Sequence, residues 1–120
     1  MGLVLADDVR EPASNTGSGP WNMSGTASGG GYVTVLAGIG DTNNSYFVAW
    51  DPLTGARSVF KGTVTNGSPV TLSVDKTLNN GGAAVAFTNA PIIWCDFPAY
   101  LAAMAAAGAA QSLASNAGAL

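Results

Sequence analysis

The sequence predicts a mainly β protein: a small antiparallel sandwich or barrel, followed by a C-terminal Ala-rich helix. Up to Asp96, short runs of β-branched and aromatic residues alternate with turn signals of Gly, Pro, Asn and Asp. After Asp96 the chain carries no charge and is rich in alanine, the strongest helix former. The 120 residues therefore divide into a β-rich domain over residues 1–96 and an Ala-rich apolar helix over residues 97–120.

The first expected strands are short and lie between glycine-rich turns. Residues 14–18 (SNTGS) form a turn-rich loop, and a strand begins at residues 20–23 (PWNM). Residues 28–31 (SGGG) form a turn. Residues 32–37 (YVTVLA) are expected to form a strand, because β-branched and aromatic side chains suit a pleated sheet. Residues 38–44 (GIGDTNN) then provide a cluster of turn residues.

The clearest unit is a hairpin. Residues 45–50 (SYFVAW) and residues 56–65 (ARSVFKGTVT) have strand composition, and residues 51–55 (DPLTG) between them have turn composition. The proline presets φ and the glycine takes a positive φ. The two-residue period of a strand separates the side chains onto two faces. One face carries Tyr46, Val48 and Trp50, and the other carries Phe47 and Ala49.

Three more strands are expected before the Ala-rich segment. After the tight turn of Asn66 and Gly67, residues 70–74 (VTLSV) would place Val70, Leu72 and Val74 on one face. Residues 79–82 (NNGG) turn the chain again. Residues 83–87 (AAVAF) and residues 92–95 (IIWC) complete the set.

The Ala-rich helix is expected to pack against protein. Asp96 can cap its first turn, which contains Pro98. Leu101 and Met104 share one stripe with Gly108. Weakly apolar alanines, interrupting Gln, Ser and Asn residues and the lack of a basic flank argue against a membrane span.

Composition narrows the possible partners. Only 9% of residues are charged, against roughly one-quarter in ordinary soluble domains. Part of the surface is therefore expected to be covered by partner proteins. The net charge is −3, and the four cations are scattered along the sequence. This excludes the basic patch that nucleic acid or an anionic membrane would need.

The sequence lacks the side chains that most enzymes use. Histidine is absent, which removes the usual activation of a Ser or Cys nucleophile and the commonest zinc ligand. Cys95 is the only cysteine, and its apolar surroundings indicate a buried core thiol. We therefore expect no enzyme, no cofactor and no metal site.

The acidic residues allow a cation site without requiring one. Asp7, Asp8 and Glu11 surround Arg10 and lack a glycine-punctuated calcium loop, so a solvated or ion-paired segment is favoured over calcium binding. The oxygen-rich residues 41–44 (DTNN) could hold a cation, and a plain Asx-turn explains them at least as well.

The tryptophans admit two interpretations. Trp21, Trp50 and Trp94 could form a platform on which a sugar stacks. Anchoring of a core or of a protein interface is the commoner role of tryptophan. The candidate interface residues are Trp21, Trp50, Trp94, Leu101, Met104 and Leu113.

The order of short motifs carries a family resemblance over residues 5–99. The chain opens with ADDVRE at residues 6–11 and continues through TGSG, GDT, the strand at residues 45–50 and GTV. It closes with LS, NNGG, VAF and CDFPA at residues 95–99. In this order the motifs resemble a module of tailed-bacteriophage virion proteins that often begins tail-fibre or appendage chains.

The resemblance implies a β-rich attachment domain that works in an oligomer, often a trimer, and it implies no catalytic residues. Fibre chains continue into a shaft and a receptor-binding tip, whereas this sequence ends after the Ala-rich segment, which favours a short connector, collar or surface protein. The leading hypothesis is a structural protein located in the virion, docked to other virion proteins of the tail or neck. The alternatives are a capsid decoration protein and, from a different class, a carbohydrate-binding module.

Overall fold

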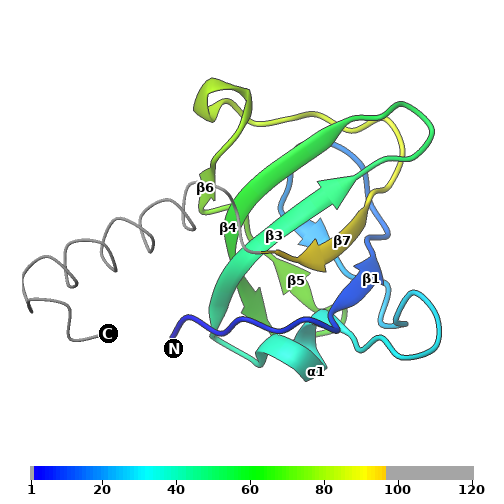
Figure 1. Ribbon diagram of the computed structural model, residues 1–120, viewed down its shortest axis with the longest axis vertical. Coiled ribbons are helices and arrows are strands. Elements are labelled where there is room, and N and C mark those ends of the chain that lie inside the picture. Colours follow the sequence, from blue (N-terminus) through cyan, green and yellow to red (C-terminus); the bar gives the residue numbers. More distant parts are fainter. Residues whose placement is uncertain (1, 97–120) are drawn as a thin grey trace, which may run out of the picture.

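The sheet is built around one long antiparallel hairpin. In this computed structural model, which describes residues 2–96, β3 (Asn44–Trp50) runs against β4 (Arg57–Thr65), with Phe47 opposite Phe60 (Figure 1). Both strands are rich in the β-branched and aromatic residues that favour an extended backbone. The predicted hairpin is confirmed, and its boundaries shift by a single residue.

Shorter strands extend the sheet on both sides of the hairpin. β7 (Ile92–Cys95) pairs with β3, and β1 (Arg10–Pro12) pairs with β7. On the other side, β5 (Thr71–Leu72) pairs with β4, and β2 (Trp21–Asn22) pairs with β5. β6 (Lys76–Thr77) also pairs with β4. The strand order is therefore β1-β7-β3-β4-β5-β2, and each of these pairs is antiparallel.

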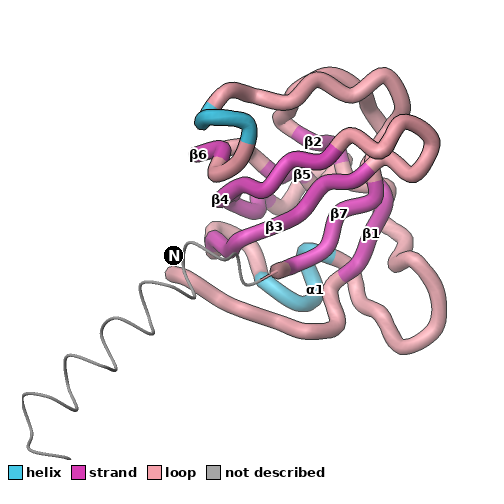
Figure 2. The backbone as a smooth tube through the Cα atoms, turned by 45° about the horizontal axis from the view of Figure 1, so that its top comes forward, coloured by secondary structure: helices cyan, strands magenta, loops and turns pink. Residues whose placement is uncertain are grey.

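The sheet curls into a half-barrel (Figure 2). An isolated antiparallel bridge joins Ala13, just after β1, to Met23, just after β2. The Ser14 amide also donates to the Asn22 carbonyl at 2.7 Å. Because β1 and β2 stand at opposite ends of the strand order, these contacts draw the two ends of the sheet together. The prediction of a mainly β, antiparallel fold is confirmed.

The core fills the inside of the curl. Phe47 and Phe60 stack with 5.7 Å between their ring centroids, and both are fully buried. Trp21 meets Phe87 edge-on at 5.4 Å, which ties β2 to the loop before β7. Each large apolar side chain that is removed from water contributes about 1.5–3 kcal/mol to folding.

Residues 32–37 do not form the predicted strand. Val33 makes a single isolated bridge, and the helix α1 (Val35–Ile39) follows it at the bottom of Figure 1. Thr34 caps this helix, since its hydroxyl accepts a hydrogen bond from the Ala37 amide at 3.2 Å. The cap and the tertiary contacts of the helix outweigh the weak local preference of these residues for a strand.

Two other predicted strands are wrong or too long. Residues 83–87 contain one bridge, from Phe87 to Gly17, and their alanines are exposed. Alanine has little preference for strands; Phe87 belongs to the core, and Val85 packs against it while partly buried. The strand expected over residues 70–74 shrinks to β5. The turn expected at residues 79–82 is present as the short 3₁₀ turn η1 (Asn80–Gly82).

The sequence patterns do not predict β1 or β6. β1 contains Glu11 and Pro12, and both residue types are depleted in strands. Its position at one end of the strand order tolerates a proline, because no further strand needs that amide. β1 and β6 form because they pair with segments that are distant in the sequence. A local residue pattern holds no information on that pairing.

The Ala-rich helix expected over residues 97–120, with Leu101, Met104 and Leu113, lies outside the described residues. Within residues 2–96 there is no helix of the length and apolar character that crossing a membrane requires.

Candidate functional site

The side chains that point away from the core form one surface of the sheet, which we call the outer face. Residues directly opposite each other in antiparallel strands point to the same side. Register therefore sets Trp94 beside both Arg10 and Val48, and it sets Tyr46 beside Lys61. The outer face includes Arg10, Tyr46, Val48, Trp50, Arg57, Val59, Lys61, Lys76, Ile92 and Trp94, of which Tyr46 and Val48 are buried.

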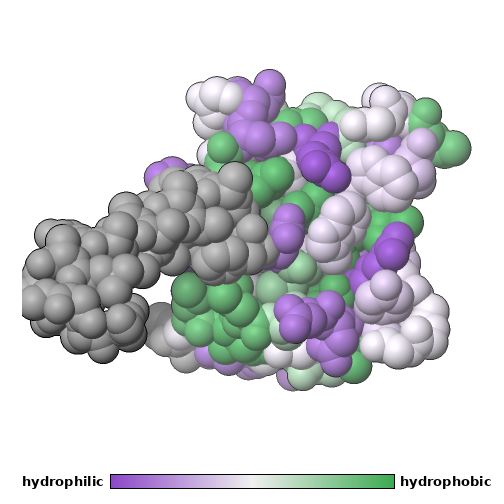
Figure 3. Space-filling model, in the orientation of Figure 1, coloured by the Kyte–Doolittle hydropathy of each residue, from purple (hydrophilic) through white to green (hydrophobic). Residues whose placement is uncertain are grey.

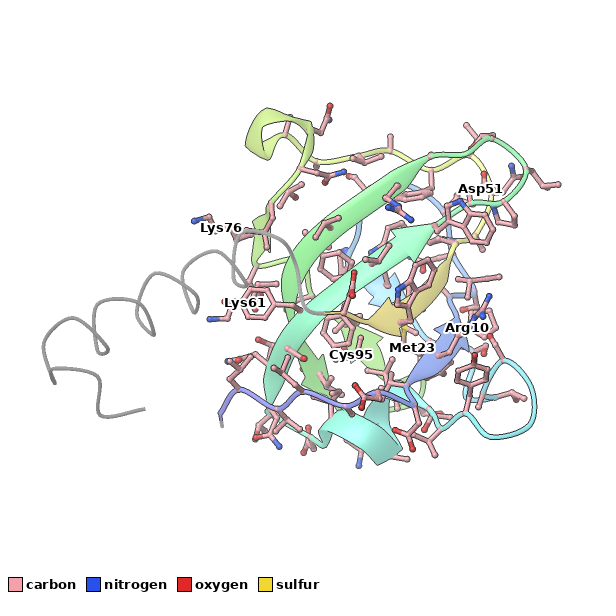
Figure 4. All side chains as sticks on the ribbon, viewed as in Figure 1. Arg10, Met23, Asp51, Lys61, Lys76 and Cys95 are labelled. Carbon is pink, nitrogen blue, oxygen red and sulfur yellow. The ribbon has the colours of Figure 1, made fainter. Side chains whose placement is uncertain are left out.

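All the cations of the chain lie on the outer face. Arg57 is paired with Trp50, Lys61 with Tyr46, and Lys76 with Lys61. Figure 4 shows Lys61 and Lys76 toward one edge of the sheet and Arg10 toward the opposite edge. The four cations that are scattered in the sequence are thus gathered on one face, although the net charge of the chain is −3.

Aromatic rings lie between these cations. Trp50 and Trp94 meet edge-to-face, with 6.2 Å between centroids and 73° between planes. The Lys61 ammonium lies 5.8 Å from the Tyr46 ring centroid. Figure 3 views the molecule from the side on which β3, β4 and β7 lie in front, and hydrophilic residues are interspersed there with neutral and apolar ones. This mixture of aromatic and cationic residues is typical of a binding surface.

Arg10 is held between two aromatic rings at one end of the outer face. Its guanidinium carbon lies 5.6 Å from the Tyr32 ring centroid and 5.8 Å from the Trp94 centroid. The loop that carries Tyr32 is hydrogen-bonded along β1, because the Arg10 amide donates to the Val33 carbonyl and the Val33 amide donates to the Asp8 carbonyl. The backbone therefore fixes both walls around the guanidinium.

A cavity of about 210 Å³ opens beside this arginine. Its lining combines an acidic, a basic, two aromatic, one aliphatic and one cysteine residue. We call this cavity the Arg10 pocket, and its lining residues are Asp7, Val9, Arg10, Tyr32, Trp94 and Cys95.

The arginine keeps unused hydrogen-bonding capacity. Its Nε is shielded from solvent and has no hydrogen-bond acceptor among residues 2–96. Burying an unpaired donor costs about 1–3 kcal/mol, so a ligand oxygen that reached it would recover part of that cost.

Glu11 corrects the expectation of a solvated or ion-paired acidic segment. Its side chain is 1% exposed. Its two oxygens accept hydrogen bonds from the Gly25 amide at 2.6 Å and from the Val35 amide at 2.8 Å. Asp7 and Asp8 are exposed, as expected. Glu11 is therefore a structural link between β1 and two other segments.

The remaining polar candidates also serve the structure. Asp41, from the oxygen-rich residues 41–44, accepts a hydrogen bond from the Asn66 amide at 2.8 Å, so it joins two turns. Cys95 is half-buried where full burial was expected, and its sulfur lies 3.2 Å from the Ser45 hydroxyl. Within residues 2–96, no three acidic or thiol side chains gather closely enough to hold a metal ion.

Asp51 organises the hairpin turn. The carboxylate accepts hydrogen bonds from the Leu53 amide at 2.9 Å, the Thr54 hydroxyl at 2.8 Å and the Asn89 side-chain amide at 3.0 Å. The hydrogen bond from Asn89 is the main cause that lowers the pKa of Asp51 below its ordinary value of 3.8. Burial opposes this shift, and the bonds from Leu53 and Thr54 add to it.

The three tryptophans have different environments. Trp21 is a core residue that is 1% exposed, whereas Trp50 and Trp94 are half-buried on the outer face. The structure thus brings two of the three tryptophans together and separates the third. Sequence reasoning missed Arg10 and Tyr32, because only the non-local pairing of β1 with β7 and with the loop before α1 brings them to Trp94.

In comparisons with known proteins, no protein-family model, curated protein or solved structure matches the chain.

Proposed function

We propose that this chain is a structural virion protein of a tailed bacteriophage. In this role it docks to the tail or neck and anchors or connects an appendage such as a fibre or collar. The order of motifs over residues 5–99 supports the proposal through its resemblance to appendage modules. No catalytic step and no cofactor belong to this role.

The outer face is the observation that carries the docking role. It gathers all four cations and two tryptophans on one side of a chain with net charge −3. Arginine and aromatic residues are enriched in the cores of protein interfaces. Such a face suits a contact with a neighbouring virion protein whose surface carries acidic groups opposite the arginines.

The proposed module works as a homo-oligomer, with a trimer favoured. A charged fraction of 9% leaves much of the surface suited to contact with other subunits. Analytical ultracentrifugation of the full chain measures this state directly. We expect a trimer, and we expect deletion of residues 100–120 to abolish it while the circular dichroism of the β domain persists. An oligomer that survives the deletion would contradict the role given to that segment.

Gold-labelled antibody against the chain, applied to intact virions, tests the location. Label at the tail or neck would support the connector role and point to appendage proteins as partners. Label over the head would favour the alternative of a capsid decoration protein. Absence of label from every particle would overturn the virion proposal.

The docking surface has its own test. Lys61→Glu reverses one charge on the outer face and should weaken co-sedimentation with the docking partner. Asp8→Asn changes one charge on an exposed side chain outside that face and should leave co-sedimentation unchanged. Equal behaviour of the two variants would argue against docking through the outer face.

A further inference from the structure

We infer that the Arg10 pocket binds a pyranose ring that carries a carboxylate, the chemistry of a uronic-acid unit in an acidic polysaccharide. This binding activity goes beyond the docking role and does not depend on it. Three features of the pocket support it: an arginine whose Nε has no acceptor among residues 2–96, two aromatic lining residues, and an aspartate on the lining.

The arginine selects for an anionic group. A guanidinium presents its donors in a planar fork that matches the two oxygens of a carboxylate. Tyr32 and Trp94 hold the Arg10 guanidinium from two sides, so little side-chain freedom is lost when a ligand arrives.

The size and the aromatic residues of the Arg10 pocket favour a ligand that contains a sugar ring. A volume of about 210 Å³ exceeds what a lone carboxylate needs, and the Tyr32 and Trp94 side chains offer apolar surface to the C–H groups of a sugar. Tyr32 is 41% exposed, so it can cover a ligand without being part of the core.

Asp7 separates a sugar acid from an acidic peptide side chain. Asp7 lines the same pocket as Arg10, and an ionised carboxylate can only accept hydrogen bonds. The hydroxyls of a pyranose would donate to it while the sugar carboxylate meets Arg10. An Asp or Glu side chain of a protein brings no hydroxyl, so it would leave Asp7 facing a like charge.

The outer face can accommodate a longer chain. Trp50 lies edge-to-face with Trp94, and Arg57 is paired with Trp50 in the sheet. A polysaccharide that leaves the pocket past Trp94 would therefore meet a second ring and then a second guanidinium. A polymer of uronic-acid units is expected to bind more tightly than a single unit, because several such contacts act together.

The experiment is a titration of the full-length protein, followed by ¹H–¹⁵N NMR. The probes are a methyl uronoside, the matching methyl hexoside with CH₂OH in place of the carboxylate, and sodium acetate. We expect saturable shifts of the Trp94 indole N–H and the Arg10 Nε–H with the uronoside, in the millimolar range. Binding of the hexoside and of acetate should each be at least about tenfold weaker, since each lacks one half of the recognised group.

Variants connect the binding to the pocket. Arg10→Lys keeps the charge and loses the planar fork, and we expect it to weaken binding at least about tenfold. Tyr32→Ala removes one wall from an exposed loop position and should weaken binding without loss of the folded spectrum. Lys61→Gln removes one cation from the same face outside the pocket and serves as the matched control, with binding within about twofold of the unmodified chain.

Three results would overturn the inference. The first is the absence of saturable shifts with the uronoside. The second is equal binding of acetate or of the neutral hexoside, which would reduce the pocket to a simple anion site or remove the need for the carboxylate. The third is an equal loss of binding in Lys61→Gln and Arg10→Lys, which would indicate general charge attraction. None of these results depends on whether virions carry the protein.

Discussion

The Glu11 Oε1 atom accepts a hydrogen bond from the Val35 amide at 2.8 Å, and this contact joins β1 to the first residue of α1. The other oxygen of the same carboxylate accepts from the Gly25 amide at 2.6 Å. One buried carboxylate therefore satisfies two backbone donors from segments that have no strand partner at these positions. Charge-assisted bonds of this kind are stronger than bonds between neutral groups.

The first prediction concerns this carboxylate. Glu11→Gln replaces one acceptor oxygen with an amide that can only donate, so one backbone N–H is left facing another donor. We expect the free energy of unfolding to fall by about 1–3 kcal/mol, measured by urea denaturation. Asp8→Asn is the control, since it neutralises an exposed carboxylate in the same segment. Equal stability of both variants would show that the Glu11 bonds contribute little.

The second prediction is a pH dependence that arises at Asp51. Its pKa is lowered in the folded protein, chiefly by the hydrogen bond from Asn89, so the ionised form favours folding. That contribution is present above the ordinary pKa of 3.8, and it is lost as the pH falls through the lower folded value. The free energy of unfolding should therefore decrease in acid. A series of urea denaturation curves from about pH 7 to about pH 3 measures it.

The matched variant is Asp51→Asn, which cannot titrate. Its destabilisation relative to the unmodified chain should be largest near neutral pH and should shrink in acid. A difference that stays constant over the series would assign the acid sensitivity to other carboxylates.

The third prediction concerns crowding at Gly62 in β4. A Cβ at this position would overlap the Ser73 carbonyl oxygen and would lie 3.0 Å from the Phe60 ring. A backbone oxygen in a paired strand cannot move aside cheaply, so Gly62→Ala should cost about 1–3 kcal/mol by thermal or urea denaturation. Gly30→Ala is the control, because its Cβ would have no neighbour within 4 Å. A neutral Gly62→Ala would mean that the contact between β4 and the chain after β5 is looser than described.

The fourth prediction separates the core tryptophan from the surface ones. Trp21→Ala removes a side chain that is 1% exposed and packs against Phe87, so we expect a loss of about 3–5 kcal/mol in the free energy of unfolding. Trp50→Ala removes a half-buried ring from the outer face and should cost clearly less. Comparable losses in the two variants would indicate that the Trp50–Trp94 contact is a second stabilising cluster.

Local sequence patterns were sufficient to predict the central hairpin. Residues 45–50 and 56–65 have strand composition, their connection has turn composition, and partners adjacent in the sequence pair in the structure. The same patterns wrongly predicted a strand at residues 32–37. There the Thr34 cap and the Glu11 carboxylate stabilise a helix, although the segment contains β-branched residues. The cap signal is visible in the sequence, whereas the carboxylate comes from a position 24 residues away.

The candidate site depends still more on distant pairing. Trp50 and Trp94 were recognisable as candidates by residue type alone, and only strand register makes them neighbours. Arg10 and Tyr32 carried no local signal, because a single arginine among acids and a tyrosine after glycines are common surface features. Their contact requires β1 to pair with β7 and the loop before α1 to run beside β1.

By itself, the sequence determined the mainly β class, the hairpin and its turn, and the low charge, because strand propensity, turn chemistry and composition are local properties. The tertiary structure alone decided that Glu11 is buried, that all four cations share one face, and that Arg10 lies between two aromatic rings. The physical reason is register: a shift of one residue in any of these non-local pairs would turn each side chain to the opposite side of the sheet.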